Sequence, residues 1–270
     1  MKTIPIILCV IVAIVIAVIV GLNIIPKPLP DSGFTAGTVE TVPLPAGLPA
    51  PVERYLQVVY GDEIPLVETV IISGRATLTI NGITLPSRYR FTHNAGQDYR
   101  HYIEATIFGL PLLKVNEKYV DGHSLFVMPF GTLEDDPNTN QGANLALWAE
   151  AVWFPAIWAT DERVEWQEVD DVSAMMHIPY EDETESILLR FDPETGLLTY
   201  LESMRFAGDK DQQKSLWVNE AQGWKEVDGY LVPEPAAVTW YQDGKPWAIF
   251  KTDELILNAE IGEYIDAVGP

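Results

Sequence analysis

Glu150 is the residue whose type and surroundings most directly suggest chemistry, because it lies inside an apolar, tryptophan-rich stretch from Leu147 to Trp158. A buried, ionised carboxylate is costly unless a partner pairs with it and hydrogen bonds satisfy it. Three roles stay open for Glu150: a structural ion pair, a contact to the polar head of a ligand, or a general acid or base whose pKa is raised by burial. Sequence spacing places no second titratable residue beside it, so no catalytic residue is predicted.

An arginine is the partner that a buried Glu150 needs, and Arg205 is the main candidate. Basic residues are scarce in this chain, and Arg205 lies on a predicted strand between Met204 and Phe206. A guanidinium group binds a carboxylate through two parallel hydrogen bonds. Strand alternation places Arg205 on the face opposite its two neighbours. Alternation alone does not determine which of the two faces is concave. We predict that Glu150 and Arg205 fix a helix against a sheet or meet the headgroup of a ligand.

The eight tryptophans all lie between positions 148 and 247. Large amphipathic rings suit the mouth of an apolar pocket, where the ring is buried and the indole N–H finds a partner. Tryptophans are also commonly core residues, and this second interpretation stays open. If a pocket exists, the predicted ligand-binding residues are Trp148, Glu150, Trp153, Arg205 and Trp240.

Motifs for metal, phosphate or nucleophile chemistry are not evident. The four histidines (His93, His101, His123 and His177) show no HExxH motif or paired ligand spacing, so no metal and no cofactor are predicted. The segment from Asp136 to Leu147 alternates oxygen ligands as calcium loops do, but its sixth and twelfth residues favour a polar loop before a helix. The Gly122–Phe126 segment resembles the start of a nucleophile elbow but lacks the final glycine.

The first residues of the chain indicate a membrane anchor. Residues 4–25 carry no charge, and 22 residues at about 1.5 Å each are long enough to cross a hydrocarbon core of about 30 Å. No small-x-small cleavage site follows, which favours a retained anchor over residues 1–25 instead of a secretory signal. We predict a single-pass protein of the cell membrane with a cytoplasmic N-terminus and an extracytoplasmic domain, since acidic domains are translocated readily.

Composition restricts the partners and divides the remaining chain. The formal net charge of −22 argues against nucleic acid and against anionic lipid headgroups, both of which require clustered lysine and arginine. Residues 26–47 are rich in proline and small residues, which predicts an extended linker that tethers the domain to the membrane. Residues 48–270 are long enough for one large domain. It begins with a short amphipathic helix between Pro49 and Gly61.

Period-two alternation and regularly spaced turns dominate the rest of the chain. Strands are expected at Ser186–Asp192 and Leu198–Phe206, and an apolar helix from Asn144 to Trp158 interrupts the strands and must be covered on most sides. The predicted fold is a mostly-β α+β fold, in which a large bent antiparallel sheet, or half-barrel, encloses this helix and follows one transmembrane helix. The turn signals are Asn81-Gly82, Asp121-Gly122, Asp192–Gly196, Asp228-Gly229 and Asp243-Gly244.

A series of short motifs over residues 48–258 resembles an uncharacterised family of bacterial membrane-anchored proteins, a domain of unknown function. The chain departs from that pattern near Tyr119, which Lys118 precedes, and at His123 after Gly122. The predicted architecture also resembles the lipoprotein-carrier (LolA-like) half-barrels, whose concave face shelters acyl chains. The motifs are Pro51-Val52-x-Arg54-Tyr55-Leu56, Glu150-x-x-Trp153-x-Pro155, Arg205, Gly229-x-x-Val232-Pro233 and Trp240.

These observations predict a membrane-anchored extracytoplasmic protein that binds a lipid or another hydrophobic molecule. Its expected partners are the lipid bilayer, through residues 4–25, and that ligand; a membrane protein partner stays open. The first alternative is a structural or accessory subunit of a membrane complex. The second is an enzyme that uses Glu150.

Overall fold

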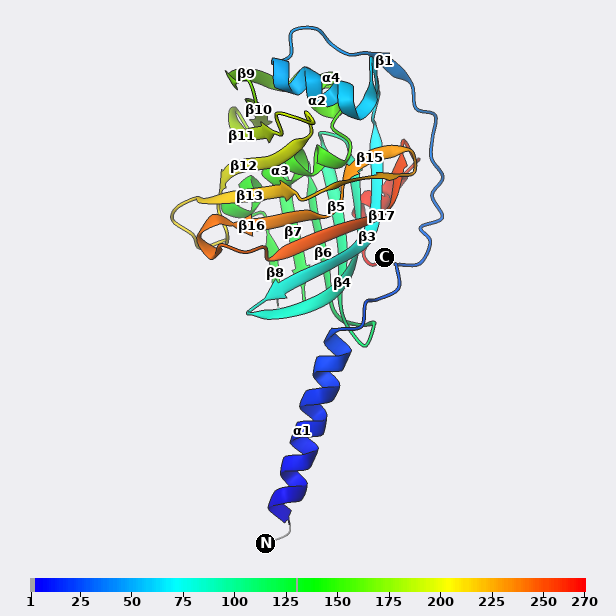
Figure 1. The fold of residues 1–270 in the computed structure, drawn as a ribbon, viewed down its shortest axis with the longest axis vertical. Coiled ribbons are helices and arrows are strands. Elements are labelled where there is room, and N and C mark those ends of the chain that lie inside the picture. The colour runs from blue at the N-terminus through cyan, green and yellow to red at the C-terminus, as the bar shows by residue number, and fades with distance from the viewer. Residues whose placement is uncertain (1–2, 130) are drawn as a thin grey trace.

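The computed structural model describes residues 3–129 and 131–270, and its main feature is a curved antiparallel sheet of 13 strands (Figure 1). One half of the sheet consists of six consecutive strands joined by hairpins. Asn81 (φ 49°) and Gly82 (φ 78°) form the first tight turn, as their sequence predicts. The six strands are β3 (Thr69–Ile80), β4 (Ile83–Asn94), β5 (Asp98–Ile107), β6 (Leu110–Val120), β7 (His123–Met128) and β8 (Gly131–Glu134).

The other half is a second run of hairpins. Ile187, Leu189 and Phe191 are buried at alternate positions, which confirms the predicted strand and the side of it that faces the core. The segment predicted at 198–206 is also a strand. This half consists of β9 (Glu165–Asp170), β10 (Ser173–Tyr180), β11 (Glu183–Phe191), β12 (Leu198–Arg205) and β13 (Ser215–Ala221).

Two late strands, β16 (Ala236–Trp240) and β17 (Ala248–Leu257), join the halves. β16 pairs with β13 and β17 pairs with β3, so the sheet is two meanders connected through non-sequential neighbours. Two small antiparallel pairs lie outside the main sheet: β1 (Thr41–Pro43) with β2 (Glu63–Pro65), and β14 (Trp224–Val227) with β15 (Tyr230–Pro233). The structure confirms the mostly-β α+β class and the large antiparallel sheet.

The predicted central helix is shorter and starts earlier than its sequence suggests. Helix α3 (Pro137–Ala149) begins at Asp136, whose carboxylate accepts a hydrogen bond from the Thr139 backbone N–H at 2.9 Å. The predicted polar loop is therefore a helix cap and the first turns of α3. The chain then continues as a 3₁₀ turn, η1 (Glu150–Trp153), breaks at Phe154 before Pro155, and forms α4 (Ile157–Thr160). A proline ring clashes with the preceding helical turn, which explains the break.

Helix α3 packs against strands from both halves of the sheet, namely β6 and β7 on one side and β10, β11 and β12 on the other. Residues of α3, η1 and α4 belong to one buried core with both halves. Helix α2 (Ala50–Tyr60) closes one end of this core through Val52, Tyr55 and Leu56, which are fully buried as predicted. The sheet therefore surrounds the tryptophan-rich segment and holds Glu150 inside.

The predicted linker is extended, but it lies along the sheet instead of standing free. The guanidinium of Arg88 donates to the carbonyl oxygens of Lys27 and Pro28, and that of Arg90 donates to Pro30. Strand β1 then adds a further docking point by pairing with β2. Prolines lack an N–H but keep their carbonyl, so a proline-rich segment still accepts hydrogen bonds from a sheet surface. The last residues, including η3 (Gly262–Asp266), also dock there: Arg100 donates to the Ala267 carbonyl at 2.7 Å.

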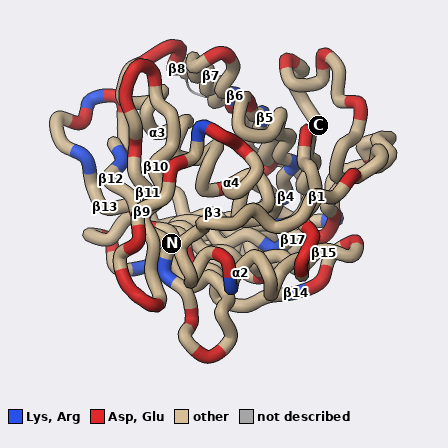
Figure 2. The backbone as a smooth tube through the Cα atoms, turned by 90° about the horizontal axis from the view of Figure 1, so that it is seen from above, with Lys and Arg blue, Asp and Glu red and all other residues tan. Residues whose placement is uncertain are grey.

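Helix α1 (Thr3–Leu22) projects from one end of the sheet (Figure 1), and its isoleucine and valine side chains from Ile6 to Val20 are exposed. Among the described residues, no helix has both the length and the apolar character that a membrane crossing requires. Residues 1 and 2 of the predicted anchor lie outside the described residues, and the anchor stays a prediction. On the folded part, acidic residues occur on loops and strand ends around the molecule and outnumber the basic ones (Figure 2).

Candidate ligand cavity and histidine–glutamate cluster

A cavity of about 160 Å³ lies between η1 and the inner face of the sheet. Both halves of the sheet contribute to its wall, together with the end of α3. Most of the lining is apolar or aromatic, including Phe91, Trp153, Leu201, Trp217, Trp247 and Phe250. The ionisable or amide side chains of the lining are His101, Glu117, Glu150, Arg205, Asn219 and Glu220.

Glu150 lies at the C-terminal end of α3 and faces two histidines of the β4–β5 hairpin. Its Oε2 atom is 2.8 Å from Nε2 of His101 and 3.2 Å from Nε2 of His93. The contact with His101 is a hydrogen bond, whereas the geometry at His93 forms none. Only 17% of the Glu150 side chain is exposed, so the carboxylate does have the partner that its burial requires, and that partner is a histidine.

The charges of this cluster shift the pKa values of its members in different directions. Burial opposes the charged form of His101, but the carboxylates of Glu150 and Glu117 outweigh burial and raise its pKa to about 9. Burial likewise opposes ionisation of Glu150, yet His101 and His93 lower its pKa to about 2. Burial lowers the pKa of His93 despite its closeness to Glu150. At neutral pH the cluster therefore holds an ionised Glu150, a protonated His101 and a neutral His93.

Behind His101 lies a second carboxylate, Glu117 of β6. Its Oε2 atom is 3.6 Å from Nδ1 of His101, on the side of the ring away from Glu150. The hydroxyl group of Tyr99 donates a hydrogen bond to the other Glu117 oxygen, and the Tyr99 ring stacks on His101 with 4.1 Å between centroids. The His101 ring is thus held between two carboxylates and against an aromatic face.

The predicted ion pair between Glu150 and Arg205 is wrong. Among the described residues, no carboxylate lies within 4.0 Å of the Arg205 guanidinium; instead it stacks 4.5 Å from the Trp217 ring centroid. Arg205 does face the cavity, while Met204 points outward and is 49% exposed, which settles which face of β12 is concave. A protonated histidine can also match a buried carboxylate, and His101 takes the place predicted for Arg205.

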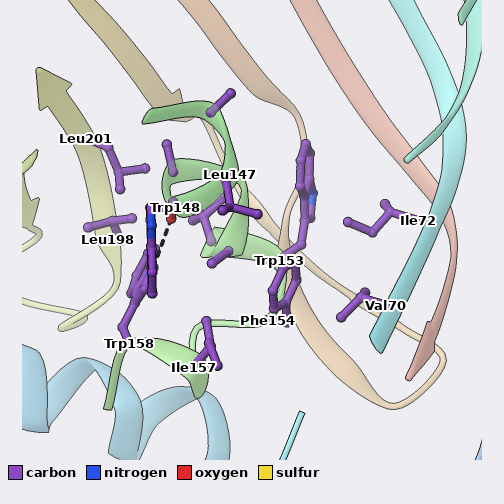
Figure 3. Close-up of a cluster of buried hydrophobic side chains, with 14 of the residues drawn as sticks. Val70, Ile72, Leu147, Trp148, Trp153, Phe154, Ile157, Trp158, Leu198 and Leu201 are labelled. Carbon is purple, nitrogen blue, oxygen red and sulfur yellow. Dashed lines mark hydrogen bonds between the residues drawn. The ribbon is translucent and has the colours of Figure 1, made fainter. Parts of the chain in front are cut away.

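The three tryptophans predicted to line a cleft have different positions. Trp153 lines the cavity. Trp148 is instead a core residue, 1% exposed, whose carbonyl oxygen accepts a hydrogen bond from the indole of Trp158 at 2.9 Å (Figure 3). Trp240 is half-buried and does not belong to the lining; its ring centroid is 6.0 Å from the Arg205 guanidinium. Figure 3 shows Trp158 on the side of Leu198 and Leu201, and Trp153 on the side of Val70 and Ile72.

Several buried hydrogen-bond donors of the cavity wall have no acceptor in the described part of the protein. They belong to five residues of the lining, which come from β12, β13, η1 and the segment just before β17. Such groups are uncommon in folded proteins, because each one loses the hydrogen bonds that water would provide. The donor atoms are Nε1 of Trp153, Trp217 and Trp247, Nε of Arg205 and Nδ2 of Asn219.

The histidine cluster is the part of the site that sequence reasoning missed. His93 and His101 lie eight positions apart, which matches no helical or knuckle-type ligand motif. They flank one hairpin, in which His93 pairs with Tyr99 and His101 pairs with Phe91, so both side chains lie on the same face as diagonal neighbours. The Ala95-Gly96 turn between two alternating runs was the available signal. The absence of paired ligand spacing in the sequence therefore did not keep these two histidines apart in the fold.

Comparisons with known proteins give a family and similar folds. No curated protein matches the chain. A DUF1329 family protein from Desulfovibrio piger is similar, with 11% identity over 80% of this chain and 96% of that chain and a TM-score of 0.44. A LolA superfamily protein from Nitrosomonas europaea is also similar, with 10% identity over 82% of this chain and 99% of that chain and a TM-score of 0.49.

A family model matches residues 37–252, a span that contains both meanders, the central helix and every residue of the cavity wall. The motifs quoted above, among them Glu150-x-x-Trp153 and Arg205, lie inside the matched span. Since the match extends over most of the chain, the protein belongs to the family of unknown function DUF6544, which confirms its predicted membership of an uncharacterised domain family.

Proposed function

We propose that this protein binds a hydrophobic molecule whose polar end carries hydrogen-bond acceptors, such as a fatty acid or another anionic amphiphile. The observation that carries the proposal is the wall of the cavity. Its surface is mostly apolar, and Arg205 is the one arginine or lysine among its lining residues. A ligand with an apolar body and an anionic or acceptor-bearing end matches such a wall, in which one charged group lies among apolar side chains.

The size of the cavity limits what enters it. An engineered protein cavity of about 150 Å³ binds benzene, and the present cavity of about 160 Å³ is of similar size. It therefore accommodates a small hydrophobic molecule, or one end of a longer amphiphile. If the ligand has a long hydrocarbon tail, part of that tail must lie outside the cavity.

Arg205 is the residue proposed to meet the polar end of the ligand. Its guanidinium has no carboxylate partner among the described residues, and its Nε atom is one of the five unpaired donors. The stacking on Trp217 fixes its position in the wall. Guanidinium groups bind carboxylates and phosphates through two parallel hydrogen bonds, so an anionic end suits this position.

Membrane attachment with the domain outside the cytoplasm is also part of this proposal. The exposed side chains of α1 support it, and so do the hairpin tips at the same end of the sheet (Figure 1). At the β5–β6 tip, Phe108 is 47% and Leu110 is 67% exposed, and the Phe108 N–H donates to the Gly21 carbonyl of α1 at 2.8 Å. Exposed apolar side chains gathered at one end are typical of surfaces that contact a membrane or a partner.

The test uses the full chain in lipid nanodiscs and cis-parinaric acid as a fluorescent fatty-acid probe. Energy transfer from the tryptophans of the wall reports binding, and empty nanodiscs give the background. We expect Ala236→Phe, which fills part of the cavity, to weaken binding at least tenfold. Ala207→Phe makes the same change at an exposed position outside the cavity and should have no effect. Equal binding by both folded variants contradicts the proposal.

A second comparison tests the role of Arg205. Arg205→Met keeps a long apolar side chain but removes the charge and the donors. We expect it to weaken binding of cis-parinaric acid at least tenfold, with a much smaller effect on the methyl ester, which lacks the charge. A variant that loses both probes equally, or neither, contradicts the role of Arg205 in binding the polar end.

A further inference from the structure

Three side chains with metal-binding atoms meet at the wall of the cavity. His93, His101 and Glu150 each offer one such atom, and the three atoms lie within 4.8 Å of one another. Both histidines approach the same Glu150 oxygen through Nε2, at 3.2 Å and 2.8 Å. Ligand atoms about 2.0 to 2.2 Å from a tetrahedral zinc ion lie roughly 3.3 Å from each other. The three side chains are thus already close to the spacing that one ion imposes.

We propose that Nε2 of His93, Nε2 of His101 and the carboxylate of Glu150 form a binding site for a Zn²⁺ ion. Two imidazoles and one carboxylate are ligands that suit zinc, and sites with three protein ligands leave a further position for water or another molecule. His101 and Glu150 also line the cavity, so the proposed site adjoins it. This inference goes beyond the proposed ligand binding and does not depend on it.

His93 gives the first independent argument for an ion. Its side chain is fully buried, and neither ring nitrogen has a hydrogen-bond partner among the described residues. A buried polar group without a partner is costly, and Nε2 of His93 lies 3.2 Å from the Glu150 carboxylate without a hydrogen bond to it. An ion between His93 and Glu150 removes the deficit at Nε2.

Glu117 gives the second argument. Histidines that bind metals almost always donate their other ring N–H to a carboxylate, a carbonyl or a water molecule. In His101 the free ring nitrogen, Nδ1, faces the Glu117 carboxylate at 3.6 Å, and Tyr99 holds that carboxylate from the other side. With Nδ1 directed at Glu117, the Nε2 atom of His101 is directed at Glu150. The lone pair of this Nε2 atom can then bind an ion.

The electrostatics of the site favour a cation. Glu117 and Glu150 provide two negative charges, and Glu150 also caps the C-terminal end of α3, where the helix dipole is negative. A zinc ion there would take the place of the hydrogen bond between His101 and Glu150. Arg205 is the other cation of the cavity, and it makes no ion pair with Glu150.

The test measures metal binding by the full chain in detergent micelles after removal of metal with a chelator. Co²⁺ is the spectroscopic probe, and Zn²⁺ competes with it. We expect one equivalent of Co²⁺ to give the visible absorption of a four- or five-coordinate ion, and one equivalent of Zn²⁺ to abolish that absorption. His93→Ala, His101→Ala and Glu150→Gln should each weaken Zn²⁺ binding at least a hundredfold. His177→Ala, which removes a histidine outside the cluster, should leave it unchanged.

Glu117→Gln tests whether the carboxylate behind His101 supports metal binding, as expected if these residues form a specific metal site. It keeps all three ligands and removes only the carboxylate behind His101, and losses of such groups typically lower metal affinity about 10–100-fold. If the ligand variants do not fold, proton NMR of the Co²⁺-loaded wild type decides, because two histidine ligands give two strongly shifted ring N–H or C–H sets. Absence of saturable binding by the folded wild type overturns the proposal. Full affinity in a folded ligand variant overturns it as well.

Discussion

At the scale of single residues, Glu150 is matched by a protonated histidine. Its carboxylate binds His101 at 2.8 Å, and Glu117 lies on the other side of the same ring. Two carboxylates around one imidazole stabilise its charged form more than burial destabilises it, so the pKa of His101 rises to about 9. The buried carboxylate and the histidine charge therefore depend on each other.

This dependence predicts a pH effect on stability in metal-free protein. The His101 pKa in the folded state lies above its ordinary value of 6.5, so its contribution is complete below about pH 6.5 and is lost as the pH rises through about 9. At about 1.4 kcal/mol per pKa unit, the full contribution is on the order of 3 kcal/mol. We expect the difference in unfolding free energy between wild type and His101→Gln to shrink by a large part of that amount between pH 6.5 and 10.

Urea unfolding followed by tryptophan fluorescence measures this difference. His177→Gln is the matched control, and its difference from wild type should not change in the same way. The pH range begins at 6.5 because the lowered pKa of His93 and the lowered pKa of Glu150 act at lower pH and with their own signs. A His101→Gln difference that stays constant across this range contradicts the ion pair.

Only some residues of the site could be predicted from the sequence. Glu150 was found because a charge inside an apolar run is conspicuous, and Arg205 was placed in the correct sheet for the same reason. His93 and His101 were missed because their meeting depends on the register of one hairpin, with His101 opposite Phe91. A shift of one residue in that register would point one histidine to the other face. Local spacing alone does not fix such a register.

At the scale of elements, α3 and η1 deliver Glu150 to the cavity. The helix is buried from Asn140 to Ala149 and is stabilised by packing against both halves of the sheet, while its N-terminus depends on Asp136. The Asp136 carboxylate accepts hydrogen bonds from the backbone N–H and the hydroxyl of Thr139, at 2.9 Å and 3.0 Å. This cap fixes the start of the helix that carries Glu150 at its other end.

Removal of the cap should therefore lower stability by a defined amount. We expect Asp136→Ala to reduce the free energy of unfolding by about 1 kcal/mol, the typical cost of losing an N-cap side chain. Asp136→Asn retains an oxygen in the capping position and should lose much less. Urea unfolding curves of the two variants measure the difference. Equal losses in both variants would argue against the capping role.

Prediction of the elements succeeded where the signal was local. The Asn81-Gly82 and Asp121-Gly122 pairs adopt the left-handed backbone that tight hairpins need, and their strands pair as expected. The pairing that joins the two meanders was not predicted, because β3 and β17 are far apart in the sequence. The early start of α3 was missed because its first turns are polar and only Asp136 marks them.

At the scale of the whole molecule, the proposed membrane attachment predicts that the α1 end of the sheet meets the bilayer. We expect a Leu110→Cys side chain at the β5–β6 tip, labelled with an environment-sensitive NBD dye, to report an apolar environment in nanodiscs. Val58→Cys on α2 is the matched control, since it is also an exposed apolar position but lies at the opposite end (Figure 1). Both variants carry Cys9→Ser, so that each has one thiol.

The experiment compares the NBD emission of the label at position 110 with that of the label at position 58. A blue-shifted and brighter emission at position 110, with a water-like emission at position 58, agrees with a membrane at the α1 end. Water-like emission at both positions shows that the hairpin tips do not meet the bilayer. This result would leave the cavity untouched, because the cavity is formed by the interior of the sheet.

The central claim is that the sheet and the tryptophan-bearing segment enclose a space made for one hydrophobic molecule. Native mass spectrometry of the full chain, released from nanodiscs, tests this claim most directly. We expect a species with one bound amphiphile per chain in wild type, its loss in Ala236→Phe and its retention in Ala207→Phe. A wild type that is free of ligand, or a bound species that persists in folded Ala236→Phe, would contradict the account.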